Sequence, residues 1–206
     1  MAATTFLMIR HGVHLLGGGT IAGRSPGVHL SPLGQEQVAQ AARRIGPLSV
    51  HAIYSSPVDR CQESAAILSE HLHLPVAVLP TLAEVDYGEW TRKRLEELRP
   101  LPRFQQWNVH RAGTRIPGGE TMLEIQSRII GELFRLREMH PDKTVAVVSH
   151  GDVIKAAVAY ALGAPLDLLA RIEISPASVT VIAWGDNQPW VLGVNSTPEV
   201  TMPYAH

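Results

Sequence analysis

Short apolar runs alternate with amphipathic helical patterns along most of this chain, and that alternation restricts its fold more than any other feature. Four of the apolar runs are typical of buried strands. They cover Thr4–Ile9, Ala52–Tyr54, Val76–Val78 and Thr144–Val148. Chains of this pattern form a mostly parallel sheet with helices on both faces. We therefore predict an α/β protein, a three-layer α/β/α sandwich with a mostly parallel central sheet.

The predicted helices are recognised by their first residues and by apolar residues three and four positions apart. Ser31-Pro32 offers an N-cap and a first-turn proline, and Ser56 with Asp59 forms a variant of the capping box before a second helix. The remaining elements are helices at 92–98, 122–136 and 152–162, a proline-broken loop after the first of these, and late strands at 179–184 and 190–194, paired as a hairpin.

Composition narrows the class of protein further. Hydrophobic residues make up 45% and charged residues 18% of the 206 positions, which suits a large buried core. A net charge of -1 argues against a nucleic-acid partner, and no apolar segment is long enough to span a membrane. A single cysteine, Cys61, fits a reducing compartment, so we expect a cytoplasmic protein. We expect one domain over residues 1–206, with a loose tail at about 198–206.

Polar side chains collect directly after three of the predicted strands. Arg10-His11-Gly12 follows the first strand, Ser55-Ser56-Pro57 the second, and Ser149-His150-Gly151 the strand at 144–148. In an open parallel sheet, ligands bind beyond the carboxyl ends of the strands. If these strands are neighbours, both histidines share one rim with Arg10 and with Arg60.

Arg60 falls in the first turn of the second predicted helix, where the helix dipole disfavours a cation. Asp59 offsets part of that effect, and a bound anion would offset more, because a helix N-terminus itself attracts anions. A solvated surface arginine is the alternative interpretation. The hypothesis of an anion site therefore depends on the neighbouring polar residues as well.

His11 is the candidate nucleophile, because a neutral imidazole attacks electrophiles near neutral pH. Arg10 and Arg60 would keep it neutral by like-charge repulsion. The same guanidinium groups match the oxygens of a phosphoryl group. His150 would bind a phosphoryl oxygen and stabilise charge in the transition state. The two glycines that follow these histidines, Gly12 and Gly151, would let the backbone approach the phosphoryl group closely.

Transfer of a phosphoryl group also needs a proton for the leaving oxygen, and a carboxylic acid is the natural donor. The segment from Leu82 to Trp90 contains three acidic residues. Spacing alone leaves open which of them serves as the acid. They are Glu84, Asp86 and Glu89.

Other phosphate and metal chemistries fit the sequence less well. A cysteine phosphatase would need an arginine six positions after Cys61, where Ile67 stands, and no Walker loop is present. The histidine pairs at 11/14 and 71/73 lack carboxylate or cysteine partners at metal-ligand spacing. We predict no metal and no other cofactor, and we expect Asp152 on the surface of its helix.

Six segments occur in an order that resembles the histidine phosphatase superfamily, which includes cofactor-dependent phosphoglycerate mutases and many small phosphatases. They are Phe6–Gly12, Leu30–Gln37, Tyr54–Arg60, Leu82–Trp90, Pro117–Thr121 and Val147–Gly151. The resemblance implies a phosphoglycerate mutase-like fold and a phosphorylated histidine at His11. It also implies a second phosphate-binding arginine at Arg60, and it selects Glu84 as the general acid and base.

The chain departs from the family pattern at the rim of the site. Val13-His14 stand where the family often has Glu, Gln or Ala followed by a small hydroxyl residue. The asparagine that commonly contacts phosphate in the family is not evident between Val13 and Gly23. Arg24 and His14 are the candidates to replace that phosphate contact.

The resemblance favours hydrolysis over phosphotransfer. In the mutases a longer arginine-rich insertion precedes Pro-Gly-Gly-Glu, whereas here only residues 91–116 lie there. We expect a phosphomonoesterase for a small phosphorylated substrate. A phosphoglycerate mutase-type phosphotransferase and a non-catalytic phospho-ligand-binding module are the alternatives, and a homodimer stays open. Four aromatic residues line a lid or belong to the core, and we favour the core: Tyr87, Trp90, Phe104 and Trp107.

Overall fold

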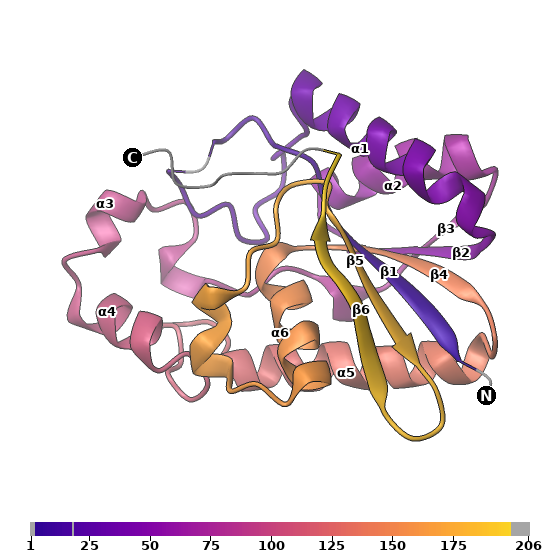
Figure 1. Cartoon of the computed structure of the whole chain (residues 1–206). Coiled ribbons are helices and arrows are strands. Elements are labelled where there is room, and N and C mark those ends of the chain that lie inside the picture. The colour runs from indigo at the N-terminus through magenta and orange to yellow at the C-terminus, as the bar shows by residue number, and fades with distance from the viewer. Residues whose placement is uncertain (1–2, 18, 199–206) are drawn as a thin grey trace.

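Six strands form one central sheet in the computed structural model, which describes residues 3–17 and 19–198 (Figure 1). They are β1 (Thr4–Arg10), β2 (Val50–Ser55), β3 (Val76–Val78), β4 (Thr144–Ser149), β5 (Val179–Trp184) and β6 (Pro189–Ser196). Their order is β3-β2-β4-β1-β5-β6. The first four are parallel, and β5 and β6 form the predicted antiparallel hairpin. The mostly parallel sheet is thus confirmed, whereas the predicted tail lies, from residue 199 on, outside the described residues.

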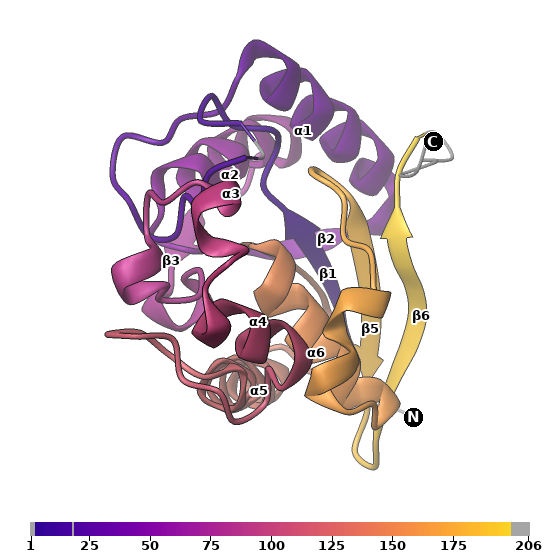
Figure 2. The ribbon, with the colours of Figure 1, turned by 90° about the vertical axis from the view of Figure 1, so that its left-hand side faces the viewer.

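Helices cover both faces of this sheet, so the three-layer prediction is confirmed (Figures 1 and 2). α1 (Pro32–Ile45) and α2 (Asp59–Leu72) lie on one face. α5 (Met122–Met139) and α6 (Gly151–Leu162) lie on the other. The short helices α3 (Leu95–Leu98) and α4 (Pro102–Val109) stand on the side toward which the parallel strands run. Four single-turn or 3-10 segments complete the chain: Gly46–Leu48, Pro80–Leu82, Gly88–Trp90 and Leu166–Arg171.

The central strands are apolar at successive positions because both of their faces are buried. In β1, Phe6 and Met8 pack in the cluster with α5 and α6, while Leu7 and Ile9 pack in the cluster with α1 and α2. All four side chains are at most 1% exposed. The side chains of β4 alternate between the same two clusters. The strands are therefore enclosed, and only their ends offer room for polar side chains.

Two local predictions were wrong, and one predicted helix is shorter than expected. α2 begins at Asp59 with Val58 as its N-cap residue, and no side chain caps it, so the predicted capping box does not form. The Ser56 hydroxyl accepts a hydrogen bond from the Val58 amide instead. The predicted helix at 92–98 is reduced to α3, and the segment expected to be a proline-broken loop contains α4, which starts at Pro102. A proline at the first helical position does not break a helix, because its missing N–H has no intrahelical partner there.

The four aromatic residues of the variable region belong largely to the core. Trp90, Phe104 and Trp107 are buried in the cluster with α5 and α6, and Tyr87 packs against them. Their rings meet edge to face or tilted, with centroids 5.2–6.0 Å apart. This packing attaches the segment with α3 and α4 to the body of the protein.

The start of α1 holds the loop that leaves β1. The Val13 carbonyl accepts hydrogen bonds from the Ser31 amide and hydroxyl, and the Val13 amide donates to the Gln37 side chain. Gly34 makes this approach possible, since a Cβ there would lie 2.0 Å from the Val13 carbonyl oxygen. The backbone just after His11 is thereby fixed against α1.

This contact predicts opposite effects for two helical glycines. Gly34→Ala should lower the free energy of unfolding by about 2 kcal/mol or more, because backbone cannot move aside as a side chain can. Gly131→Ala in α5 is the matched control, since its Cβ would meet no atom within 4 Å. That variant should raise the free energy of unfolding by about 0.5–1 kcal/mol. Urea unfolding measures both, and equal stabilities would contradict the close approach of α1 to Val13.

Candidate active site

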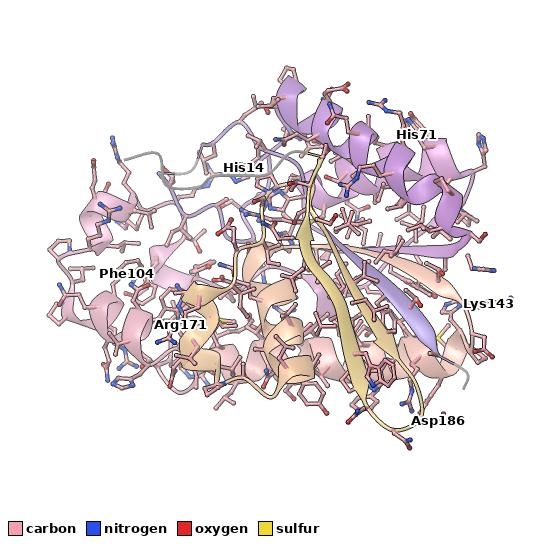
Figure 3. All side chains as sticks on the ribbon, in the orientation of Figure 1. His14, His71, Phe104, Lys143, Arg171 and Asp186 are labelled. Atoms are coloured by element: carbon pink, nitrogen blue, oxygen red, sulfur yellow. The ribbon has the colours of Figure 1, made fainter. Side chains whose placement is uncertain are left out.

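Three neighbouring strands bring the predicted polar clusters together. β2, β4 and β1 are adjacent and parallel, so Ser55, Ser149 and Arg10 end at one edge of the sheet. The centroids of the His11 and His150 rings lie 5.3 Å apart at this edge. Figure 3 shows His14 there as well, at the end of the sheet opposite Lys143 and the β5–β6 turn with Asp186. The predicted juxtaposition of the two histidines is present.

Hydrogen bonds define which nitrogen of His11 is free. Nδ1 lies 2.8 Å from the Gly12 carbonyl oxygen, which only accepts, so Nδ1 carries the proton. Nε2 accepts a hydrogen bond from Arg60 Nε at 3.0 Å. The ring is thus neutral, with the Nε2 lone pair directed toward the arginine. Only 3% of the His11 surface is exposed, so neighbouring residues hold the ring in this position.

Arg60 is almost fully buried at the centre of the site, with 1% of its surface exposed. Its Nη2 donates to the Gly23 carbonyl at 2.9 Å and lies 3.1 Å from His150 Nδ1. Glu84 Oε2 is 3.6 Å from the same nitrogen. Its Nη1 is buried without a hydrogen-bond partner among the described residues. Arg60 was predicted at this rim, and the structure places it between both imidazoles and the carboxyl group.

Arg10 brings a second guanidinium group to the same edge. Its Nη1 donates to the Ile174 carbonyl, whereas its Nε is buried and has no partner within residues 3–17 and 19–198. A Cβ on Gly151 would lie 3.5 Å from the Arg10 guanidinium carbon, an ordinary van der Waals distance, so Arg10 passes close to the first residue of α6. Gly12 is used differently, since its amide donates to the Ser64 hydroxyl. Phosphate contacts from Gly12 and Gly151 stay predictions.

His150 is held by residues that the sequence did not assign to the site. Its Nε2 lies 2.8 Å from the Ser56 hydroxyl, and the Cys61 sulfur is 3.4 Å from the same nitrogen. A serine hydroxyl both donates and accepts. Ser56 is therefore compatible with either neutral form of the ring, whichever nitrogen carries the proton. Burial raises the pKa of the Cys61 thiol to about 12, so it packs as a neutral group.

The two imidazoles resist protonation. Burial is the largest cause, and the neighbouring Arg60 and Arg10 charges add to it, so the pKa of His11 lies well below its ordinary value. Burial and Arg60 have the same effect on the pKa of His150. His14 lies nearby, with its ring centroid 5.7 Å from that of His11, and its pKa is lowered to about 4. All three rings are uncharged near neutral pH.

Glu84 faces this group from the loop after β3. Its Oε2 lies 3.5 Å from His150 Nδ1. Burial raises the pKa of Glu84, and the Asp152 carboxylate adds to that shift, whereas Arg60 opposes it. The carboxyl group is thus biased toward its protonated form beside neutral imidazoles. This arrangement suits an acid that donates its proton to a substrate.

An ionic network fixes the backbone of Glu84. The Glu84 carbonyl accepts from Arg24 Nε at 2.7 Å and from Arg128 Nη2 at 3.1 Å. Glu120 joins the two guanidinium groups and accepts from the Asp86 amide. Arg24 thus holds the acid-bearing segment in this structure, and its direct contact to phosphate stays a prediction. His14, the other candidate for that phosphate contact, lies at the end of the sheet where the site is (Figure 3), and its contact to phosphate also stays a prediction.

Sequence reasoning missed Ser56, Glu120 and Arg128 as supporting residues. Ser56 was assigned to helix capping, and Glu120 appeared only as part of a motif. Arg128 offered one signal, because it lies within the apolar stripe of α5 beside Ile129. Asp152 was expected on the surface, which is wrong. Its side chain is only 15% exposed, and its carboxylate accepts hydrogen bonds from the Tyr87 hydroxyl and from Arg111.

The described part of the chain contains neither a metal-binding cluster nor a membrane-spanning helix. No cluster of three or more His, Cys, Asp and Glu side chains is arranged to hold a metal ion there. Among the helices formed by those residues, none combines the length and the apolar character needed to cross a membrane.

The whole arrangement matches a known family. The model of the family described as "Histidine phosphatase superfamily (branch 1)" matches residues 6–197, and the chain belongs to this superfamily. Phosphoserine phosphatase 1 of Hydrogenobacter thermophilus is 29% identical over 170 residues, which cover 82% of this chain and 81% of the relative. The probable phosphoglycerate mutase GpmB of Cronobacter sakazakii is 30% identical and covers 79% and 76%, respectively.

Solved structures show the same fold. The phosphoserine phosphatase of Entamoeba histolytica, in complex with 3-phosphoglyceric acid, superposes with a TM-score of 0.85 at 24% identity and covers 95% of this chain and 98% of its own. A mycobacterial glucosyl-3-phosphoglycerate phosphatase has the same TM-score and identity and covers 95% and 100%. The family includes phosphatases that act on small phosphate esters, and this chain shares their fold over nearly its whole length.

Proposed function

We propose that this chain is a phosphomonoester hydrolase that works through a phosphohistidine on His11. Glu84 is the general acid and base, and Arg10, Arg60 and His150 bind the phosphoryl oxygens. Relatives named as phosphatases support the hydrolytic reaction. The two guanidinium groups supply the positive charge that a metal ion provides in other phosphatases, so the proposal requires no metal.

One observation carries this proposal. Arg60 Nε donates to the free Nε2 of His11, while Arg60 Nη1 and Arg10 Nε are buried donors without partners among the described residues. A buried donor that lacks an acceptor costs about 1–3 kcal/mol. Two guanidinium groups and the single carboxyl group of Glu84 also leave the site positive, whether or not that carboxyl group is ionised. An anion with several acceptor oxygens, such as a phosphoryl group, satisfies both the donors and the charge.

In the first step, the phosphoryl group displaces the Arg60 hydrogen bond from His11, and Nε2 attacks phosphorus. The N–P bond forms as the bond from phosphorus to the leaving oxygen breaks, and Glu84 transfers its proton to that oxygen. The arginines bind the equatorial oxygens. His150 donates from Nδ1 to one of them, since the Ser56 hydroxyl can then donate to Nε2.

In the second step, water replaces the departed alcohol. Glu84, now a carboxylate, takes a proton from the water as its oxygen attacks phosphorus and the N–P bond breaks. His11 returns to its neutral form, with Nδ1 still protonated and donating to the Gly12 carbonyl. Inorganic phosphate is the product, and the site regains its starting proton count.

Trapping of the intermediate tests this proposal. Brief mixing with a radiolabelled aryl phosphate in EDTA should give a base-stable, acid-labile label on the wild type and none on His11→Ala. Circular dichroism should show that both proteins are folded. A wild-type label that is acid-stable, or that survives in His11→Ala, would contradict the proposed nucleophile. Isomerisation of 3-phosphoglycerate with its bisphosphate cofactor, without release of phosphate, would identify a mutase instead.

The charge next to Glu84 predicts a shift in the pH profile of the reaction. Asp152 raises the pKa of Glu84, so Asp152→Asn should lower that pKa. Glu84 then loses its proton at lower pH, and the alkaline limb of kcat/KM should move to lower pH. Asn retains an acceptor for Tyr87 and Arg111, which protects the local structure.

Asp186→Asn is the matched control for this prediction, because it removes the same charge at the opposite end of the sheet (Figure 3). Its profile should coincide with that of the wild type. Measurement with one substrate throughout cancels the ionisation of the substrate itself. An unshifted alkaline limb in Asp152→Asn would argue against Glu84 as the acid.

A further inference from the structure

A cavity of about 390 Å³ opens between the α3–α4 segment and the start of α6. The aromatic residues that line it are Tyr87, Phe104 and Trp107. Its polar lining includes Arg99, Arg111 and Asp152. The labelled Phe104 in Figure 3 marks the side of the molecule on which it lies.

Shared residues connect this cavity to the phosphoryl site. Asp152 directly follows Gly151, and a Cβ on Gly151 would lie 3.5 Å from the Arg10 guanidinium carbon. The Tyr87 hydroxyl donates to Asp152 at 3.0 Å, and the Tyr87 ring lies 3.7 Å from the position of a Cβ on Gly23, whose carbonyl accepts from Arg60. A group attached to a phosphoryl at His11 therefore has this cavity beside it.

Two residues that line the cavity carry buried hydrogen-bond donors without partners in the described part of the chain. Trp107 is only 3% exposed, and its Nε1 has no partner among residues 3–17 and 19–198. The Nε atom of Arg111 likewise has no hydrogen-bond partner among these residues. The Arg111 guanidinium group stacks over the Trp107 ring, with its carbon 4.1 Å from the ring centroid. Each such donor costs about 1–3 kcal/mol when it stays unpaired. Unmet donors of this kind favour a ligand with an acceptor.

Charge in the cavity points to the same kind of ligand. Asp152 pairs with Arg111 at 3.3 Å, so these two charges offset each other. Arg99 has no ion pair within the part of the chain that the structure describes, and its side chain is the remaining charge in the lining. An anionic acceptor therefore complements the polar lining, and the three aromatic rings suit a flat apolar group that carries it.

We infer that this cavity receives the leaving group of the substrate, and that it selects an aromatic or similarly bulky apolar group bearing a carboxylate. This inference rests on the proposed function, because it assumes a phosphoryl group at His11. Arg99 and Trp107 determine the specificity, and the donors of Trp107 and Arg111 bind the carboxylate. Small polar esters would leave both the rings and these donors without contacts.

Equilibrium binding to the His11→Ala protein tests the inference without any chemistry. Calorimetry compares 4-carboxyphenyl phosphate with 4-carbamoylphenyl phosphate, which has nearly the same shape but no second anionic group. The carboxylate should bind about tenfold more tightly, as expected for hydrogen bonds to a charged acceptor. Arg99→Gln and Trp107→Phe, each added to His11→Ala, should reduce that ratio about threefold or more.

Arg94→Gln in the same background is the matched control. Arg94 lies on the exposed start of α3, where it pairs with Glu96, and it does not line the cavity. It should leave the ratio of the two dissociation constants unchanged. Equal binding of both ligands, or a ratio that neither Arg99→Gln nor Trp107→Phe reduces, would overturn the inference. Phosphohistidine formation by the wild type decides the proposed function separately, so the two failures are distinguishable.

Discussion

The buried guanidinium of Arg60 is the interaction on which the site depends. It donates to Nε2 of His11 at 3.0 Å and lies 3.1 Å from Nδ1 of His150. The Nε2 atom of His11 must then offer a lone pair, so the His11 ring must be neutral. A buried cation is tolerated only with such partners. The same contact therefore satisfies the arginine, keeps the nucleophile uncharged and leaves one unpaired donor for an incoming anion.

The fold makes that contact rigid. β1 supplies His11, β4 supplies His150, and the turn after β2 leads into Arg60, so three adjacent parallel strands deliver the three side chains to one edge. Residues outside these three strands fix the backbone around the reacting groups. α1 fixes the backbone after His11 through Val13, and the network of Arg24, Glu120 and Arg128 fixes Glu84. The backbone that carries His11 and Glu84 is thus fixed by contacts from other segments.

Much of this was predictable from the sequence, because enclosed strands must be apolar at successive positions and polar groups can then collect only at their ends. His11, His150 and Arg60 were found in this way. The missed features depend on contacts between distant residues: Arg24 meets Glu120 from 96 positions away, and Asp152 meets Arg111 from 41. Ser56 was assigned to capping because a serine before a proline suits both a helix start and a strand end. The helix α4 was missed because the prolines of this segment were taken to mark a loop, whereas Pro102 begins the helix.

The neutrality of His11 is the central claim, and nitrogen NMR of its imidazole ring tests it most directly. With selectively labelled histidine, and with His11→Ala to assign the signal, Nδ1 of His11 should carry the proton and Nε2 should be unprotonated. This form should persist as the pH falls well below the ordinary histidine pKa of about 6.5. A ring that titrates near that value, or one that carries its proton on Nε2, would contradict the account.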